Sequence, residues 1–232
     1  MSRKRKLKKG NDEPAFKKRK KNTGKDSHLF TDDNPATTVK GTGFTDENKA
    51  KYTLKIMKGR DITYQFQVIN TMYYRAKSVL KRTKNVVKQK NIEGAINLFD
   101  EWLNEYRNKN RKSEMKNYIK LKDLNKLISL GKYYKVDQQF CHVFDELNGD
   151  IKRLRIHNVS SKNISWDIYR NKRINEIISK YKDDNELYCK VNDIEIPSLY
   201  HCELIMYGYT PDLSNINSIT KNVKKFMEIH ND

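Results

Sequence analysis

Apolar side chains recur every three or four residues through most of the chain after residue 44, and this spacing restricts the fold more than any other feature. One such stripe begins after Asp61 and has these members: Ile62, Phe66, Ile69, Met72 or Tyr73, Ala76 and Leu80. An α-helix turns once in about 3.6 residues, so the stripe lies along one helix face and can be buried against a neighbour. The sequence therefore predicts a mainly α-helical protein.

The first helical group covers residues 45–108 and predicts a compact three-helix unit. Thr45 is expected to cap its first helix and Asp61 its second, because short polar side chains accept hydrogen bonds from the free amides of a first turn. A third helix is expected over about residues 91–106. Short connections between three amphipathic helices favour a small bundle.

A second helical unit is expected over residues 118–182. Its apolar spacing predicts one helix that ends near Gly131, another that ends near Gly149, and a longer one that begins after Ser165. The fold class that we predict is mainly α, with two small helical bundles and a disordered basic N-terminal tail.

Residues 183–232 form a third region, in which the charge changes sign. It holds 4 basic and 9 acidic side chains, a balance of −5, whereas residues 27–182 hold 32 basic and 17 acidic ones, or +15. Two short apolar segments around Asn192 and Asp193 are compatible with one short β-hairpin, and helices are expected after Ser198 and near the end. We expect this acidic region to dock on a protein partner or to fold back on the basic body.

The N-terminal arm, residues 1–44, combines a very basic tail with a polar linker. Its first 26 residues carry twelve basic and three acidic side chains, or +9 of the total +19. Such a self-repelling segment cannot bury enough apolar surface to fold, so we expect disorder. Two dense basic clusters predict a nuclear import signal and contacts to a polyanion, with a solubility tail as the alternative. The arm residues assigned to nucleic acid are Arg3, Lys4, Arg5, Lys6, Lys17, Lys18, Arg19, Lys20 and Lys21.

Composition also restricts the protein class. The longest apolar runs have four or five residues, so we expect no transmembrane helix and no membrane partner. The basic N-terminus lacks the apolar stretch of a secretory signal. Cys141, Cys189 and Cys202 are an odd number without close spacing, which favours a reducing compartment over a disulfide framework.

Candidate chemical sites are weak in this sequence. Gly41 and Gly43 precede a helix, but no strand and no lysine of a phosphate loop accompany them, so a linker is the better interpretation. Cys189, His201 and Cys202, or Cys141 with its neighbouring histidine, do not have the spacing of a common zinc site. We expect buried, hydrogen-bonded side chains there, no catalytic residues, no metal and no cofactor.

Two basic helix segments are candidates for nucleic-acid contacts. The second helix and its end carry Arg75, Lys77, Lys81, Arg82 and Lys84, and the helix after Ser165 carries Arg170, Asn171, Lys172 and Arg173. A helix with arginine, asparagine and lysine can enter a major groove, where arginine pairs with guanine, asparagine with adenine and lysine with phosphate. The alternative is a solvated face of a lysine-rich protein.

Aromatic pairs give a second hint, because exposed rings can stack on unpaired bases. The pairs are Tyr73 with Tyr74 and Tyr133 with Tyr134. Helical cores also use aromatic residues at such positions, and we favour packing for both pairs.

The segment from Trp166 to Arg173 closes the second helical unit with a basic helix, and in this it resembles a homeobox-like module. The usual Trp-Phe-x-Asn-Arg run is missing. The chain is similar in class and composition to the homeobox-like accessory subunits of the DNA adenine methyltransferase complexes of ciliates. That resemblance implies that a partner subunit carries out methyl transfer while this chain helps to hold DNA.

The function that we expect is a non-catalytic nuclear accessory subunit that binds nucleic acid, DNA in preference to RNA. Its acidic C-terminal region would contact a protein partner, which the resemblance suggests is a methyltransferase subunit. The alternatives are an RNA-binding ribosome-assembly factor and a pure protein-interaction subunit.

Overall fold

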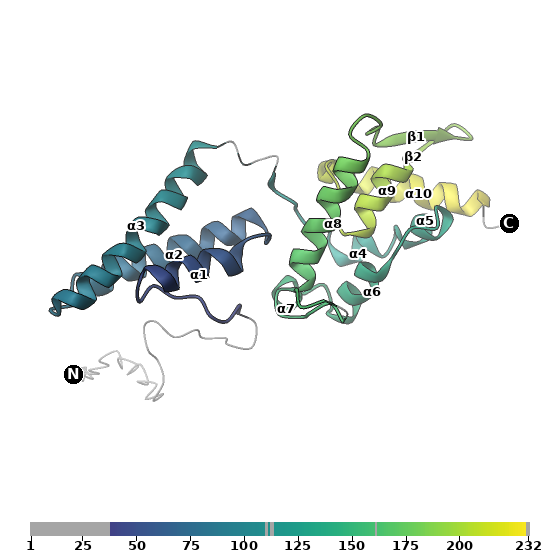
Figure 1. Cartoon of the computed structure of the whole chain (residues 1–232). Helices are drawn as coiled ribbons and strands as arrows, with labels where there is room; N and C mark the ends of the chain where they lie inside the picture. Colours follow the sequence, from purple (N-terminus) through teal and green to yellow (C-terminus); the bar gives the residue numbers. More distant parts are fainter. Residues whose placement is uncertain (1–37, 110, 112–113, 161, 231–232) are drawn as a thin grey trace, which may run out of the picture. The chain divides into compact units, whose positions relative to one another are not determined.

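The structure is a computed structural model that describes residues 38–109, 111, 114–160 and 162–230. Within those residues it is mainly α-helical, with ten α-helices and one two-stranded antiparallel sheet near the C-terminus (Figure 1). The predicted fold class is thereby confirmed. No helix in the described ranges is both long and apolar enough to cross a bilayer.

Three long helices form the N-terminal bundle: α1 (Glu47–Met57), α2 (Ile62–Leu80) and α3 (Val86–Asn108). Their apolar stripes meet in a small core of these buried residues: Ala50, Ile69, Ala95, Phe99 and Leu103. Full burial of side chains as large as Phe99 and Leu103 contributes about 1.5–3 kcal/mol each. All three helices lie within residues 45–108, where the sequence predicted a three-helix unit.

The bundle differs from the prediction at its edges. The first N-cap is Asp46, not Thr45, because the Asp46 carboxylate accepts from the amide of Lys49. The folded chain also begins earlier than residue 45: Val39 is buried, and the Thr53 hydroxyl donates to the Gly43 carbonyl. The expectation that the linker is unstructured up to residue 44 is therefore wrong for residues 38–44.

The rest of the described chain contains these elements: α4 (Leu121–Leu124), α5 (Ile128–Tyr133), α6 (Gln139–Glu146), α7 (Ile151–Leu154), α8 (Trp166–Lys180), β1 (Tyr188–Val191), β2 (Ile194–Pro197), α9 (Leu199–Met206), the 3-10 turn η2 (Leu213–Asn215) and α10 (Ile216–His230). The helix expected to end at Gly131 is instead two short helices, α4 and α5. Gly131 lies inside α5, where a β-carbon would come within 2.4 Å of the Met206 sulfur. This glycine allows α5 to approach α9 closely.

One hydrophobic core has buried members from Ile119 to Phe226 and includes residues of all the elements from α4 to α10 except the 3-10 turn and β1, whose apolar side chains pack against it. We call it the C-terminal core. Helix α9 lies within it, with Cys202, Leu204, Ile205 and Met206 fully buried. A helix that is buried on nearly all sides needs neighbours on nearly all sides, and α5, α8 and β2 supply them. The boundary predicted at residues 182 and 183 is therefore wrong, and the acidic region folds back onto the basic body.

The β-hairpin is the most accurately predicted local element. Strands β1 and β2 pair in register from Tyr188 opposite Pro197 to Val191 opposite Ile194. Asn192 and Asp193 connect them with φ values of 49° and 59°. Asparagine and aspartate tolerate this left-handed conformation better than other non-glycine residues, and two such residues in sequence make a tight hairpin turn.

Polar contacts link the α1–α2 turn to α8. The Arg60 guanidinium donates to the Asp167 carboxylate at 2.7 Å, and both side chains are buried. The Asn171 amide donates to the Gly59 carbonyl at 3.0 Å. A buried ion pair that also satisfies backbone groups favours one arrangement of the elements it joins.

Candidate nucleic-acid interface

The turn between α2 and α3 carries the densest group of exposed cations among the described residues. We call Lys77, Lys81, Lys84 and Lys88 the α2–α3 basic surface; all four side chains are exposed. The short turn between the two helices keeps these lysines close together in the chain. Arg75, also predicted for this site, is half-buried.

No acidic residue occurs between Asp61 and Glu93, so the sequence offers this surface no local counter-charge. Among the described residues, Lys81, Lys84 and Lys88 form no ion pair. The Lys77 ammonium contacts the Tyr73 hydroxyl at 3.3 Å, and Arg82 donates to Ser78. Uncompensated exposed cations raise the local concentration of polyanions.

Lys88 belongs to this surface but was not among the predicted site residues. The third helix begins at Val86, about five residues earlier than expected, because Asn85 caps it through the amide of Lys88. Apolar spacing could not show this start, because Val86 and Val87 are 75% and 70% exposed. The acid-free window between residues 62 and 92 was the signal that could have identified Lys88.

The predicted contact of Arg170 with nucleic acid is wrong, because this side chain is fully buried in the C-terminal core. Its five N–H donors all have acceptors: the carbonyls of Tyr207, Lys116, Asn117 and Gly208 and the side-chain oxygen of Asn171. Burial lowers the Arg170 pKa, although an arginine remains charged in proteins. Arg170 therefore organises the fold.

The other α8 residues also fail to form a recognition surface. Asn171 is buried, and its amide is committed to the Gly59 carbonyl, so the prediction that it reads a base is wrong. Lys172 and Arg173 both pair with Glu176, at 3.8 Å and 2.5 Å. One carboxylate thus offsets part of the positive charge that remains exposed on α8. The predicted site residues are not brought together here as they are at the α2–α3 turn.

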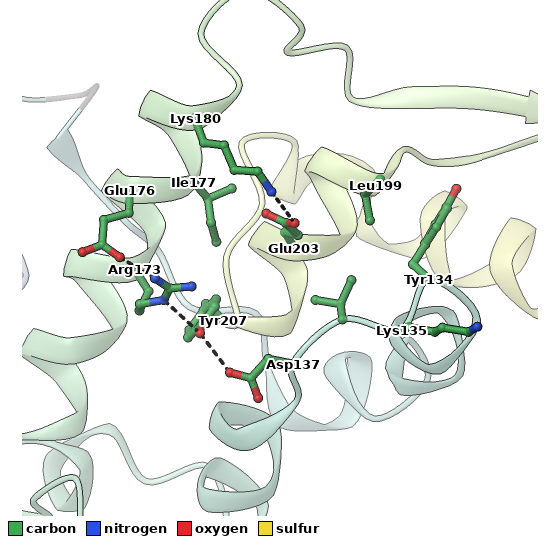
Figure 2. Close-up of a pocket in the computed structure, with 11 residues that line it drawn as sticks. Tyr134, Lys135, Asp137, Arg173, Glu176, Ile177, Lys180, Leu199, Glu203 and Tyr207 are labelled. Carbon is green, nitrogen blue, oxygen red and sulfur yellow. Dashed lines mark hydrogen bonds and ion pairs between the residues drawn. The ribbon is translucent and has the colours of Figure 1, made fainter. Parts of the chain in front are cut away.

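A cavity of about 350 Å³ lies beside α8, and Arg173 lines it together with residues of α9 and of the segment after α5 (Figure 2). Figure 2 shows Arg173 pointing at the Tyr207 hydroxyl, which in turn points at Asp137. Three cations line the cavity, Lys135, Arg173 and Lys180, and three acids oppose them, Asp137, Glu176 and Glu203. This balanced lining does not favour an anion such as phosphate.

The pKa values of two groups in this cavity, Tyr207 and Arg173, are raised further above 7. Burial raises the pKa of Tyr207 to about 12. The hydrogen bond to Tyr207 raises the pKa of Arg173 above its usual value. Neither group exchanges a proton near pH 7, which general acid–base chemistry would need from it.

The predicted structural role of His201 is confirmed. Its Nδ1 lies 2.9 Å from the Leu187 carbonyl oxygen and its Nε2 lies 2.8 Å from the Thr210 hydroxyl. Since a carbonyl only accepts, Nδ1 carries the proton and Nε2 accepts from Thr210. Burial lowers the His201 pKa to about 4, so the ring is neutral at pH 7.

The cysteines are packed in a similar way. Cys141 and Cys202 are buried, and burial raises the Cys141 pKa to about 12, so its thiol stays protonated. Cys189 is half-buried beside the Tyr134 hydroxyl. Across the described ranges, no three His, Cys, Asp or Glu side chains lie close enough to hold a metal ion.

The predicted residues of the basic arm, from Arg3 to Lys21, lie outside the described residues. The site that the structure brings together is thus the α2–α3 basic surface. Comparison of the whole chain with protein-family models, with curated proteins and with solved structures finds no match.

Proposed function

We propose that this protein is a non-catalytic nucleic-acid-binding subunit that engages phosphates through the α2–α3 basic surface and the basic arm. The observation that carries the proposal is the acid-free stretch between Asp61 and Glu93, which presents five exposed lysines, four of them in the α2–α3 basic surface. Elsewhere among the described residues many exposed cations have an acidic neighbour, as Lys172 and Arg173 have in Glu176.

The mechanism is charge neutralisation. Each lysine that approaches a phosphate releases condensed counterions from the nucleic acid, and this release provides binding free energy that falls as salt rises. Such contacts carry little sequence information, so binding through this surface would be largely sequence-independent. The arm would add further contacts and a faster encounter, since long-range attraction steers a polyanion toward the protein.

The proposed ligand is DNA in preference to RNA. The proposed location is the nucleus, because the two basic clusters of the arm have the character of an import signal. The partner would be a protein, and the resemblance described above makes a DNA adenine methyltransferase subunit the first candidate. Exposed acids after α8, namely Asp183, Asp184 and Glu186, give such a partner a surface of opposite sign to the rest of the protein.

The first experiment measures binding of the full chain to duplex DNA and duplex RNA of equal length at about 50 mM salt, where phosphate contacts are strongest. We expect DNA binding that weakens when Lys17, Lys18, Arg19, Lys20 and Lys21 are all changed to glutamine. Tighter binding to RNA would support the ribosome-assembly alternative, and binding to neither would support a pure interaction subunit.

The second experiment tests the accessory role. The full chain is purified from nuclei with its associated proteins, before and after nuclease treatment. A catalytic subunit that persists after nuclease supports the proposal, because that association does not depend on shared nucleic acid. Loss of every partner on nuclease treatment would contradict it.

A further inference from the structure

The solvent-facing side of α2 is polar, basic and free of acids. Its exposed side chains are Thr63, Gln67, Thr71, Tyr74, Lys77 and Ser78, and Lys81 follows at the C-cap. In a helix, residues three, four or seven apart share a face. Tyr74, Lys77 and Lys81 are spaced in this way, so one exposed ring lies in line with two cations.

Tyr74 is the most exposed of the four tyrosines in the two aromatic pairs. Its side chain is 57% exposed, and its ring meets that of Tyr73 edge-on, with centroids 5.2 Å apart. Tyr73 itself packs against the core of the N-terminal bundle. Tyr133 packs edge-on against Phe226, and the Tyr134 hydroxyl donates to the Pro197 carbonyl. These contacts confirm the prediction of packing for those three, and Tyr133 nevertheless stays 43% exposed. Tyr74 is more exposed than any of them.

We propose that this face of α2 is a platform for unpaired bases, on which Tyr74 stacks with one base while Lys77 and Lys81 contact the phosphates of the same strand. The proposal rests on the proposed nucleic-acid binding and specifies the ligand as single-stranded. Each base has an apolar π-face that can stack on an aromatic side chain, and nearby cations can track the backbone. Lys77 and Lys81 lie about 4.5 Å and about 10 Å further along the helix axis than Tyr74, which places both charges on one side of the ring.

A single strand suits this face better than a duplex does. In a duplex each base already stacks on its neighbours, so an exposed ring gains nothing from the base faces there. The basic side chains alone would still bind duplex phosphates. Loss of the Tyr74 ring should therefore lower the affinity for a single strand but not for a duplex, whereas loss of the lysines should lower both affinities.

The test uses the full chain with an oligo(dT) strand of about 20 nucleotides, long enough to cover a typical single-strand site, and a duplex of the same length. Binding is measured by fluorescence anisotropy for wild type, Tyr74→Ala and Tyr74→Phe. Tyr52→Ala serves as the matched control, since Tyr52 is a comparably exposed tyrosine on α1. Thermal unfolding of each variant verifies that it is folded.

We expect Tyr74→Ala to weaken oligo(dT) binding about tenfold, Tyr74→Phe to retain it within about twofold, and duplex binding to stay unchanged in both. The Tyr52→Ala control should match wild type on both probes. If Tyr74→Ala leaves oligo(dT) affinity intact, or weakens both ligands equally, the platform is wrong while phosphate binding stands. If wild type binds neither probe, both the platform and the proposed function are wrong.

Discussion

The guanidinium carbon of Arg170 lies 3.6 Å from the centroid of the Tyr118 ring, inside the C-terminal core. A cation over a ring face is attracted by the ring's quadrupole, more so when water is excluded. Within the described part of the chain, Arg170 donates to four backbone carbonyls and one amide oxygen and to no carboxylate. Arg170, one of the residues predicted to contact nucleic acid, therefore ties α8 to the segments around residues 116 and 207.

Arg170→Lys should destabilise the protein by roughly 3 kcal/mol or more. A lysine has three donors and cannot match five fixed acceptors, so buried carbonyls lose their partners. Arg170→Met should cost at least as much, because it removes every donor. Urea unfolding followed by circular dichroism measures both. An Arg170→Lys variant as stable as wild type would show that these bonds contribute little.

The burial of Arg170 could have been predicted from the sequence, but the charge of its side chain favoured the opposite interpretation. Trp166, Ile174 and Ile177 form the apolar stripe of α8, and Arg170 lies on that stripe, four residues from both Trp166 and Ile174. Helical spacing thus predicts an inward-facing arginine. The interpretation of residues 170–173 as a recognition surface gave residue type more weight than position, and the burial of Arg170 shows that position decides here.

A second prediction concerns the ion pair between Arg60 and Asp167. Either Arg60→Gln or Asp167→Asn should destabilise the fold by roughly 3 kcal/mol, because each leaves an uncompensated buried charge. The double variant Arg60→Gln with Asp167→Asn should cost less than the sum of the two single changes. Denaturant unfolding of the four proteins forms a double-mutant cycle. Strict additivity would indicate that the two groups do not interact.

Glycine positions give a matched pair of predictions. At Gly131 an added β-carbon would meet the Met206 sulfur at 2.4 Å and the Gln138 amide at 2.6 Å, so Gly131→Ala should cost about 1–3 kcal/mol through overpacking. At Gly94, inside α3, the nearest atom is the Glu47 β-carbon at 3.4 Å. Gly94→Ala should therefore stabilise α3 by about 0.5–1 kcal/mol. Thermal unfolding of both variants compares them, and a destabilised Gly94→Ala with an unaffected Gly131→Ala would contradict the packing described here.

The pH dependence of stability should report His201. Its pKa falls from 6.5 to about 4 on folding, because burial disfavours the charged ring. The unfolded chain therefore binds more protons between these values. Stability should be full above pH 6.5 and should fall as the pH drops toward 4, by about 2 kcal/mol between pH 7 and pH 5 from this group.

Urea unfolding of wild type and of His201→Gln at pH 7 and pH 5 isolates this contribution. Glutamine does not titrate, so the difference between the two proteins should shrink by about 2 kcal/mol at the lower pH. A constant difference at both pH values would mean that His201 does not stay neutral on folding. Other groups titrate equally in both proteins and cancel in the comparison.

The limits of sequence reasoning are physical in this chain. Local signals worked where one residue decides the structure, as with the Asp61 cap and the Asn192 and Asp193 turn. The change of charge near residue 183 did not mark a domain boundary, because cores form from apolar faces and not from net charge. Helix α9 instead carries Cys202, Leu204, Ile205 and Met206, and such a largely apolar helix is typical of a central position.

The candidate site was only partly predictable for the same reason. Lys77, Lys81 and Lys84 were identified from their exposed positions around a helix end, and the structure exposes them. Lys172 and Arg173 were identified by the same reasoning, but Glu176 lies one helical turn away and pairs with both. Whether a basic helix offers free charge depends on such neighbours.

The most direct test of the nucleic-acid proposal is the salt dependence of duplex DNA affinity for the full chain and for the triple variant Lys81→Gln, Lys84→Gln and Lys88→Gln. Its control carries glutamine at Lys221, Lys224 and Lys225 of α10, which removes the same charge elsewhere. If about six phosphates are neutralised, wild type and control should show a log–log slope of about −5, and the triple variant about −2.5. Equal slopes and affinities for all three proteins would contradict the account.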